Sequence, residues 1–378
     1  MTRRAHHGGV ATGQRPWGGE REPTINGTGS DAVVDGGRVA LFEIGDRHGI
    51  RAAITNFGGR VVALMAPDWQ GAIADVVLGY GTLKGYLANL EHYLGALIGR
   101  YANRIENSRF ELKGVSYELD PNEGRHCLHG GSPGFHGRVW NIVNHDKHSL
   151  VLSRVSADGE GGFPGTLEVQ AKYAIEDETA LVIELTAVSD KTTVVNLSSH
   201  MYFNLAGAHA GPINDHRLEL RASRFTPVDE QLIPTGEFRS VRSTPMDFRS
   251  ARRIGEAMFQ DDEQLRFGSG FDHNFAVDSH DAGTLNAVAM VTEPKTGRTM
   301  QLFSNQPGVH FYTGNHLDDA GIGKQGIAIE RHHGFCLEAQ NFPAAPNRAG
   351  FPNCVLEPGE PYRSEIVYRF GVAGGRRP

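Results

Sequence analysis

Apolar and polar residues alternate through most of the chain after residue 38, and this alternation predicts strands. In Thr166–Ile175 every second residue is apolar, and most of the residues between them are polar. A period of two residues is the signature of a strand with one buried face. The same signature recurs in Ala180–Val188, Met300–Phe303, Val309–Thr313 and Glu365–Phe370. Arg109–Leu119 predicts a hairpin that turns at Lys113–Gly114.

Helical periodicity is scarce, and short helices are expected only within Leu83–Leu90 and Ala251–Leu265. Strands and helices do not alternate along the chain, which argues against a parallel doubly wound sheet. Neither a GxGxxG motif nor a phosphate-binding loop follows a predicted strand. With 48 glycines and 18 prolines the chain is rich in turn formers. The predicted fold class is therefore all-β, a large antiparallel β-sandwich with few short helices.

The domain organisation follows from composition. Residues 1–36 are Gly-rich and polar, and we expect a disordered leader there. Residues 37–372 contain no linker and no internal repeat, so a single β-sandwich domain is predicted, with residues 373–378 as a tail.

Charge and cysteine usage exclude several classes of protein. The net charge is −7 without a basic cluster, so nucleic acid is not an expected partner. Apolar runs fall short of the roughly 18 residues of a membrane span. The three cysteines form no disulfide framework, which fits a reducing compartment. The leader has no apolar signal-peptide core. Together these features predict a cytoplasmic protein.

Six segments interrupt the strand pattern with polar side chains set among glycines and aromatic residues. Such a mixture suits a sugar, whose C–H face packs on a ring and whose hydroxyls need polar partners. The segments are Gly99–Arg104 (GRYANR), Leu128–Gly131 (LHGG), Asn196–Asn204 (NLSSHMYFN), Gly270–Phe275 (GFDHNF), Gln306–Asn315 (QPGVHFYTGN) and Gly334–Asn341 (GFCLEAQN).

These segments, in this order, resemble the galactose mutarotase (aldose 1-epimerase) family. The resemblance extends to NFGGRVVALMAPD, EGGFPGTLEV, HRLELRASRFTPVDEQLIPTGE and FPNCVLEPGEPY, and it covers roughly residues 39–371. It implies a large antiparallel β-sandwich, in agreement with the strand pattern. It also implies an isomerase that interconverts the α and β anomers of free aldohexoses such as D-galactose and D-glucose, without a cofactor or metal.

The resemblance assigns three residues to the chemistry. Glu338 matches the general base that takes the proton from the C1 hydroxyl, and His200 matches the general acid that protonates the ring oxygen O5. His129 matches a histidine that assists near C1 and O5 and that could share the acid role. Strand alternation puts Glu338 on one face with Cys336 and Gln340. A carboxylate on a buried face is costly unless it is paired or functional.

Five residues are expected to bind the sugar. Asn103, Arg104 and Asp272 match hydroxyl contacts of the family, and Gln306 and Tyr202 are further pocket candidates. Arg100 and His273, which neighbour these residues, are expected to be structural.

Several alternatives stay open at this stage. Asp272 and Glu338 could form a glycosidase pair, although the resemblance gives them different roles. A hexose-6-phosphate 1-epimerase of the same superfamily would need additional cations for the phosphate. A non-catalytic sugar-binding protein would keep the fold and lose the acid or base. His332–His333 suggest a metal, but adjacent strand residues point to opposite faces. The expected partner is a small monosaccharide, and both monomer and homodimer are compatible with the sequence.

Two departures from the family pattern lie near the predicted site. Ser198–Ser199 stand before His200 where Thr-Asn is more usual, and Asn122–His126 (NEGRH) contains fewer asparagines than expected before LHGG. The second segment is expected to border the pocket and therefore to bear on sugar preference.

Overall fold

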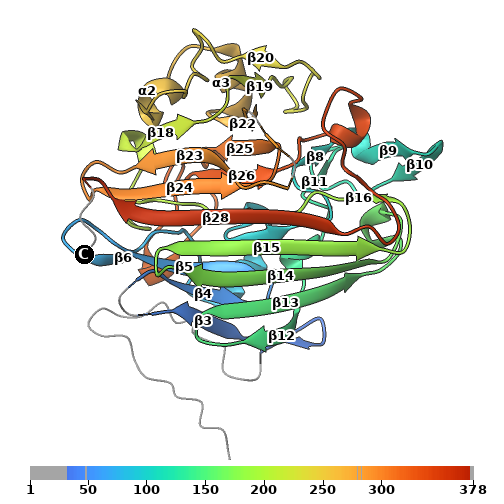
Figure 1. The fold of residues 1–378 in the computed structure, drawn as a ribbon, viewed down its shortest axis with the longest axis horizontal. Coiled ribbons are helices and arrows are strands. Elements are labelled where there is room, and N and C mark those ends of the chain that lie inside the picture. The colour runs from blue at the N-terminus through green and yellow to red at the C-terminus, as the bar shows by residue number, and fades with distance from the viewer. Residues whose placement is uncertain (1–31, 47–48, 279, 282, 375–378) are drawn as a thin grey trace, which may run out of the picture.

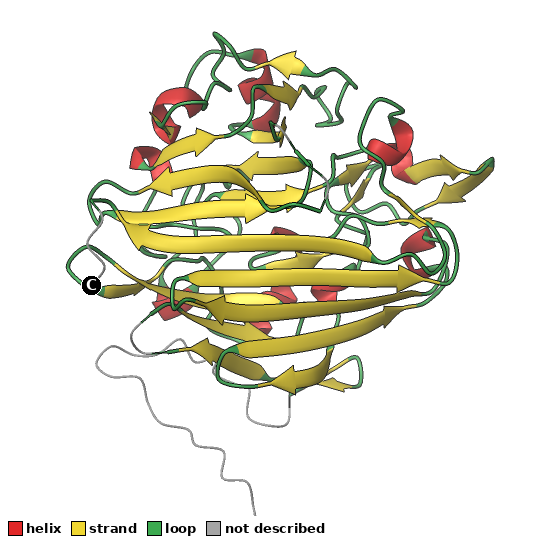
Figure 2. Cartoon of the chain, in the orientation of Figure 1, coloured by secondary structure: helices red, strands yellow, loops and turns green. Residues whose placement is uncertain are grey.

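The structure of the protein is a computed structural model that describes residues 32–46, 49–278, 280–281 and 283–374. Strands dominate these residues (Figure 2). The largest element is a nine-stranded antiparallel sheet that crosses the molecule (Figure 1). Its strands, in spatial order, are β12 (Asn141–His145), β13 (Ser149–Ser156), β14 (Leu167–Glu176), β15 (Ala180–Ser189), β28 (Tyr362–Val372), β24 (Arg298–Ser304), β23 (Asn286–Thr292), β18 (Arg217–Leu220) and β21 (Arg252–Arg253).

Two smaller antiparallel sheets share a hydrophobic core with the large one. The first has the strands β20 (Arg239–Ser240), β19 (Arg224–Thr226), β22 (Asp272–Ala276), β25 (Gly308–Tyr312) and β26 (Cys336–Gln340). The second has the strands β3 (Leu41–Gly45), β4 (Arg51–Thr55), β5 (Arg60–Pro67) and β6 (Ile73–Asp75).

One hydrophobic core joins the three sheets. It contains Tyr173 and Ile183 from the large sheet, Ile54 from the four-stranded sheet, and Val309 and Leu337 from the five-stranded sheet. Each of these side chains comes from the inward face of its strand, because successive residues of a strand point to opposite faces. The predicted β-sandwich is therefore confirmed, as are the strands expected from alternation, with ends that differ by a few residues.

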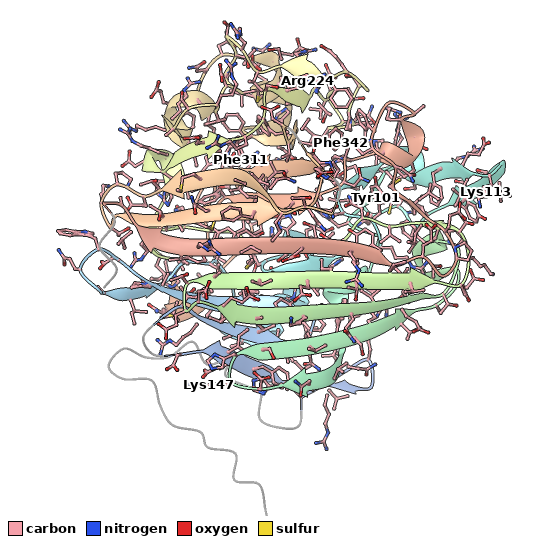
Figure 3. The ribbon with its side chains drawn as sticks, viewed as in Figure 1. Tyr101, Lys113, Lys147, Arg224, Phe311 and Phe342 are labelled. Carbon is pink, nitrogen blue, oxygen red and sulfur yellow. The ribbon has the colours of Figure 1, made fainter. Side chains whose placement is uncertain are left out.

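Short strand pairs among the described residues form separate two-stranded sheets. They are β1 (Val33–Val34) with β2 (Gly37–Arg38), β7 (Ala96–Ile98) with β17 (Ser198–His200), β8 (Arg104–Ile105) with β11 (Cys127–Leu128), β9 (Arg109–Leu112) with β10 (Val115–Glu118), and β16 (Thr193–Val194) with β27 (Val355–Leu356). The predicted hairpin is β9–β10, which projects from the body with Lys113 at its tip (Figure 3). The β1–β2 hairpin includes residues 33–36, the last part of the expected leader, whereas residues 1–31 lie outside the described residues.

The α-helices of the described residues are short. Thr82 caps α1 by accepting a hydrogen bond from Gly85 N, and Asp262 caps α3 through Gln264 N. The helices are α1 (Leu83–Ala88), α2 (Ile254–Met258) and α3 (Glu263–Gly268). Single 3₁₀ turns are η1 (Leu90–His92), η2 (Glu106–Ser108), η3 (Phe135–Gly137), η4 (Glu160–Gly162), η5 (Ile213–Asp215), η6 (Lys324–Gly326) and η7 (Ala345–Asn347). Among the described residues, no helix combines the length and the apolar composition that a membrane span needs.

Candidate active site

One face of the five-stranded sheet carries the polar side chains of the candidate site. Antiparallel register puts Asn274 of β22 opposite His310 of β25, and His310 opposite Glu338 of β26. Glu338 lies between Leu337 and Ala339, which point into the hydrophobic core. It therefore shares the opposite face with Cys336 and Gln340, as predicted.

His200 reaches this face from β17. That strand is held to β26 by a hydrogen bond of 2.8 Å from Ser198 Oγ to the carbonyl of Ala339. Nε2 of His200 lies 3.7 Å from Oε1 of Glu338, and Nδ1 lies 3.4 Å from Sγ of Cys336. The imidazole and the carboxyl group are both buried. The two residues expected to act as acid and base are thus brought into contact, although 138 positions separate them in the sequence.

His129 joins the pair from a loop after β11. The backbone N–H of Asn103 donates to Nδ1 of His129 over 3.1 Å, and the N–H of His129 donates to the carbonyl of Asn103. When the imidazole is neutral, its proton therefore lies on Nε2. One ligating atom from each of His129, His200 and Glu338 lies within 4.8 Å of the other two. The three predicted chemical groups form one cluster.

Tyrosine rings surround the imidazole of His200. The ring of Tyr202 lies 5.0 Å from it, that of Tyr93 lies 5.7 Å away in a stacked arrangement, and that of Tyr312 lies 6.4 Å away. Tyr93 also packs edge-on against His129 at 4.5 Å. Tyr202 was expected at the site. These rings give the cluster an apolar wall and fix the orientation of both imidazoles.

A chain of charged groups borders the cluster. Both oxygens of Glu123 accept hydrogen bonds from Arg104, at 2.6 Å from Nε and 2.7 Å from Nη2. Nη1 of Arg104 lies 3.6 Å from Oδ2 of Asp272, whose Oδ1 lies 2.5 Å from Nε2 of His310. Arg104 and Asp272 are buried, as a pair of sugar-hydroxyl ligands would be.

Burial sets the protonation of the cluster. It raises the pKa of Glu338 well above its usual range, and the negative charge of Asp272 adds to this effect. Burial lowers the pKa of His200 to about 3 and also lowers the pKa of His129, where the charges of neighbouring His200 and Arg104 act in the same direction. Each of the three groups alone therefore favours its uncharged form.

Asp272 and Arg104 behave in the opposite way. Burial alone would raise the pKa of Asp272, but Arg104 and the hydrogen bond to His310 hold it well below its usual range. Burial alone would lower the pKa of Arg104, but Asp272 and Glu123 hold it above its usual range. Asp272 is thus a fixed anion and an acceptor of hydrogen bonds, and it is not suited to donate a proton.

The three clustered groups also resemble the His₂Glu ligand set of zinc enzymes. The orientation of His129 does not fit such a site. A metal-bound histidine normally donates its other N–H to an acceptor. Here Nδ1 of His129 accepts from a backbone N–H, so Nε2 keeps the proton and has no free lone pair for a cation.

The structure brings together most of the expected residues but not Gln306. The side-chain amide of Gln306 donates to Asn305 Oδ1 over 3.1 Å and to the carbonyl of Arg363 over 3.4 Å, and both partners lie outside the cluster. Arg100 is structural, as expected, because its guanidinium is bonded to Ser156 and to backbone carbonyls.

Sequence reasoning missed His310, Tyr93, Tyr312 and Glu123 as neighbours of the site. His310 and Tyr312 lie in the segment that suggested Gln306, and their alternation along a strand was the available signal. Tyr93 and Glu123 reach the site only through packing and ion pairing, so the sequence offered no comparable signal for them.

Gly130→Ala is expected to damage the loop that holds His129. Gly130 has φ of +87°, and a Cβ there would lie 2.1 Å from the carbonyl oxygen of Gly99. Such overpacking costs about 1–3 kcal/mol, and positive φ adds about 1–2 kcal/mol for a residue with a side chain. Thermal unfolding measures the loss of stability, and kcat measures the effect of a displaced His129 loop on turnover. Gly124→Ala is the matched control, because Gly124 also has positive φ but nothing lies within 4 Å of its added Cβ. Equal destabilisation of the two variants would contradict the expected clash.

Comparisons with known proteins agree with this geometry. The model of the family described as aldose 1-epimerase matches residues 40–369. A galactose mutarotase of Bos taurus is 40% identical over 345 residues, covering 91% of this chain and 97% of the relative. An aldose 1-epimerase of Escherichia coli K12 is 33% identical, covering 89% of this chain and 96% of the relative. The crystal structure of an aldose epimerase homologue from C. elegans is similar with a TM-score of 0.81 and 31% identity, covering 88% of this chain and 99% of that one.

The family match over residues 40–369 shows an isomerase that acts on carbohydrates. More narrowly, the chain belongs to the aldose 1-epimerase family.

Proposed function

We propose that the enzyme interconverts the α and β anomers of free aldohexoses such as D-galactose and D-glucose. The observation that carries the proposal is the distance of 3.7 Å between Glu338 and His200. The two oxygens that exchange protons in mutarotation, O1 and O5, are bonded to the same carbon. A base and an acid that lie this close can serve both oxygens of one bound sugar at the same time.

In the proposed reaction Glu338 takes the proton from the O1 hydroxyl while His200 gives a proton to O5. The electron pair left on O1 forms the C1=O1 double bond, and the C1–O5 bond breaks with its electrons going to O5. The open-chain aldehyde turns about C1–C2. The reverse transfers then close the ring on either face of C1. The Nε2–H of His129 supports the charge that develops on the oxygens.

The opposed pKa shifts are consistent with one proton shared by Glu338 and His200. When the proton is on Glu338, both groups are uncharged. When the proton is on His200, the two groups form an ion pair, and the net charge of the pair is unchanged. Such a pair titrates as a unit. Moving the proton onto His200 creates the base and the acid together, without transfer of a net charge into the buried site.

The sugar's other hydroxyls are assigned to Arg104, Asp272 and Asn103, and one sugar face is assigned to the ring of Tyr202. Asp272 as a fixed anion accepts from hydroxyls, and Nη1 of Arg104 donates to them.

The three cysteines are free and buried, which supports a cytoplasmic enzyme. We keep monomer and homodimer as the two candidate states.

A glycosidase is the less favoured candidate. Hydrolysis with two carboxyl groups needs one of them to remain protonated as an acid. Glu338 favours its protonated form and Asp272 is ionised, so protonation alone does not separate the two candidates. The family model that matches residues 40–369 is that of aldose 1-epimerase, and this match favours the epimerase.

Polarimetry tests the proposal. Freshly dissolved α-D-galactose and α-D-glucose are followed with and without catalytic amounts of protein, in EDTA. Relaxation well above the spontaneous rate is expected for both sugars and would also exclude a removable metal. No acceleration of either sugar would reject the proposed function.

Arg104→Ala is expected to act mainly through KM. The truncation removes a hydrogen bond to substrate that is present in both the ground state and the transition state, and it leaves Asp272 and Glu123 without their cation. A rise in KM of about tenfold or more is expected, since bonds to charged groups contribute about 1.5–3 kcal/mol. Initial rates over a range of sugar concentrations separate KM from kcat. An unchanged KM would remove Arg104 from the sugar site.

A further inference from the structure

Glu123 lies on a loop that is anchored beside the candidate site. The Asn122 side chain accepts from the N–H of Leu128 over 2.7 Å and donates to its carbonyl over 2.9 Å. Glu123 and His126 exchange backbone hydrogen bonds at the turn. These bonds tie the loop to β11, which pairs with the strand of Arg104. The carboxylate of Glu123 is thereby placed against the guanidinium.

The pairing uses a defined part of that guanidinium. Nε and Nη2 of Arg104 both donate to Glu123, whereas Nη1 faces Asp272 at 3.6 Å. This leaves one edge of the group directed toward the polar cluster. In charge terms, one cation lies between two carboxylates, and the three groups together carry one negative charge.

The solvent exposure of the side chains differs among Arg104, Asp272 and Glu123. The side chains of Arg104 and Asp272 are 7% and 8% exposed, whereas that of Glu123 is 36% exposed. Glu123 thus lies at the boundary between solvent and the buried pair. Its charge acts on Arg104 with little screening, because both hydrogen bonds are short and the guanidinium is buried.

We propose that Glu123 determines specificity by neutralising Arg104, so that the enzyme accepts uncharged aldoses and discriminates against anionic ones such as sugar phosphates and uronates. The proposal rests on the proposed mutarotase function and names its substrate class. An anionic substituent near Arg104 meets a cation whose charge is already balanced, together with a further carboxylate. Charge repulsion of this kind typically sets which partner is rejected.

The experiment compares Glu123→Gln with the wild type on D-glucose, D-glucose 6-phosphate and D-glucuronate. Gln keeps the size of the side chain and removes its charge. The ratio of kcat/KM for each anionic sugar to kcat/KM for glucose is expected to rise by at least about tenfold, because facing like charges cost several kcal/mol at an interface and solvent screens part of this cost at Glu123. Glu118→Gln is the matched control, because Glu118 pairs with Arg109 on the exposed β9–β10 hairpin. Its ratio is expected to equal that of the wild type.

Salt dependence gives a second measurement that needs no variant. In the wild type, the same ratio is expected to rise with ionic strength, since salt weakens repulsion at the half-exposed carboxylate. The proposal would be overturned if folded Glu123→Gln kept the wild-type ratio of kcat/KM for the anionic sugars to kcat/KM for glucose. It would also be overturned if the wild-type ratio were near one and independent of salt. Failure of the proposed function has a different outcome, which is no turnover of glucose by the wild type.

Discussion

Glu338→Gln is expected to lower kcat by at least about 10²–10⁴-fold, the contribution of one positioned proton transfer. The amide keeps the shape of the side chain and a hydrogen bond to O1, but it takes no proton from the hydroxyl. His200 then also lacks the anion that would hold a proton on it at 3.7 Å. Sugar binding through Arg104 and Asp272 is left in place, so KM is expected to change only a few-fold.

The same variant is expected to be at least as stable as the wild type. Glu338 is 1% exposed, and its Oε2 has no hydrogen-bond partner among the described residues. A buried carboxyl group without a full set of partners destabilises a fold. Polarimetry with purified variants measures kcat, and thermal unfolding measures stability. Glu184→Gln, which removes a half-exposed carboxylate on β15 paired with Lys172, is the control for the charge change. Wild-type turnover of Glu338→Gln would reject Glu338 as the base, and a large fall in melting temperature would indicate a structural role.

Much of the fold could be predicted because alternation reports which side of a strand is buried. Leu167, Val169 and Tyr173 do lie in the core, and β14 and β15 pair from Leu167–Ser189 to Glu176–Ala180, within a residue of the predicted ends. Alternation does not report which strands pair. The place of β28 between β15 and β24 depends on contacts between residues far apart in the sequence. The short hairpin of β1 and β2 was missed because it consists of two residues on each side and lacks a periodic pattern.

The site shows the same division. The resemblance supplied Glu338, His200 and His129 as residue types at motif positions, and the structure brings them within 4.8 Å of one another. What it could not supply were neighbours set by register and packing. His310 touches Asp272 because β25 lies between β22 and β26, and Glu123 reaches Arg104 because the loop after β10 folds back on β8. Gln306 was a further pocket candidate, but its side-chain amide donates to Asn305 and to the backbone of Arg363.

His200→Gln is expected to lower kcat by about 10²–10⁴-fold with a small change in KM, because the amide donates a hydrogen bond to O5 but does not transfer a proton. Gln is preferred to Ala here, because it keeps polar atoms at the end of the side chain, where Nε2 of His200 faces Glu338, and fills more of the space among Tyr93, Tyr202 and Tyr312. Turnover is measured by polarimetry, and circular dichroism with thermal unfolding checks that the variant is folded. Turnover near that of the wild type would transfer the acid role to His129.

The double variant of Glu338 and His200 distinguishes a coupled pair from two independent catalysts. Independent groups give losses of transition-state stabilisation that add, whereas groups that act as a unit give a double variant hardly worse than either single one. The shared proton and the contact of 3.7 Å predict the second result. A loss of kcat in the double variant equal to the product of the two single losses would show that each group works without the other.

His129→Gln, made in the wild type and in each of these variants, is expected to reduce kcat further in every case. Nδ1 of His129 is held by Asn103, and the contribution of His129 does not depend on the shared proton.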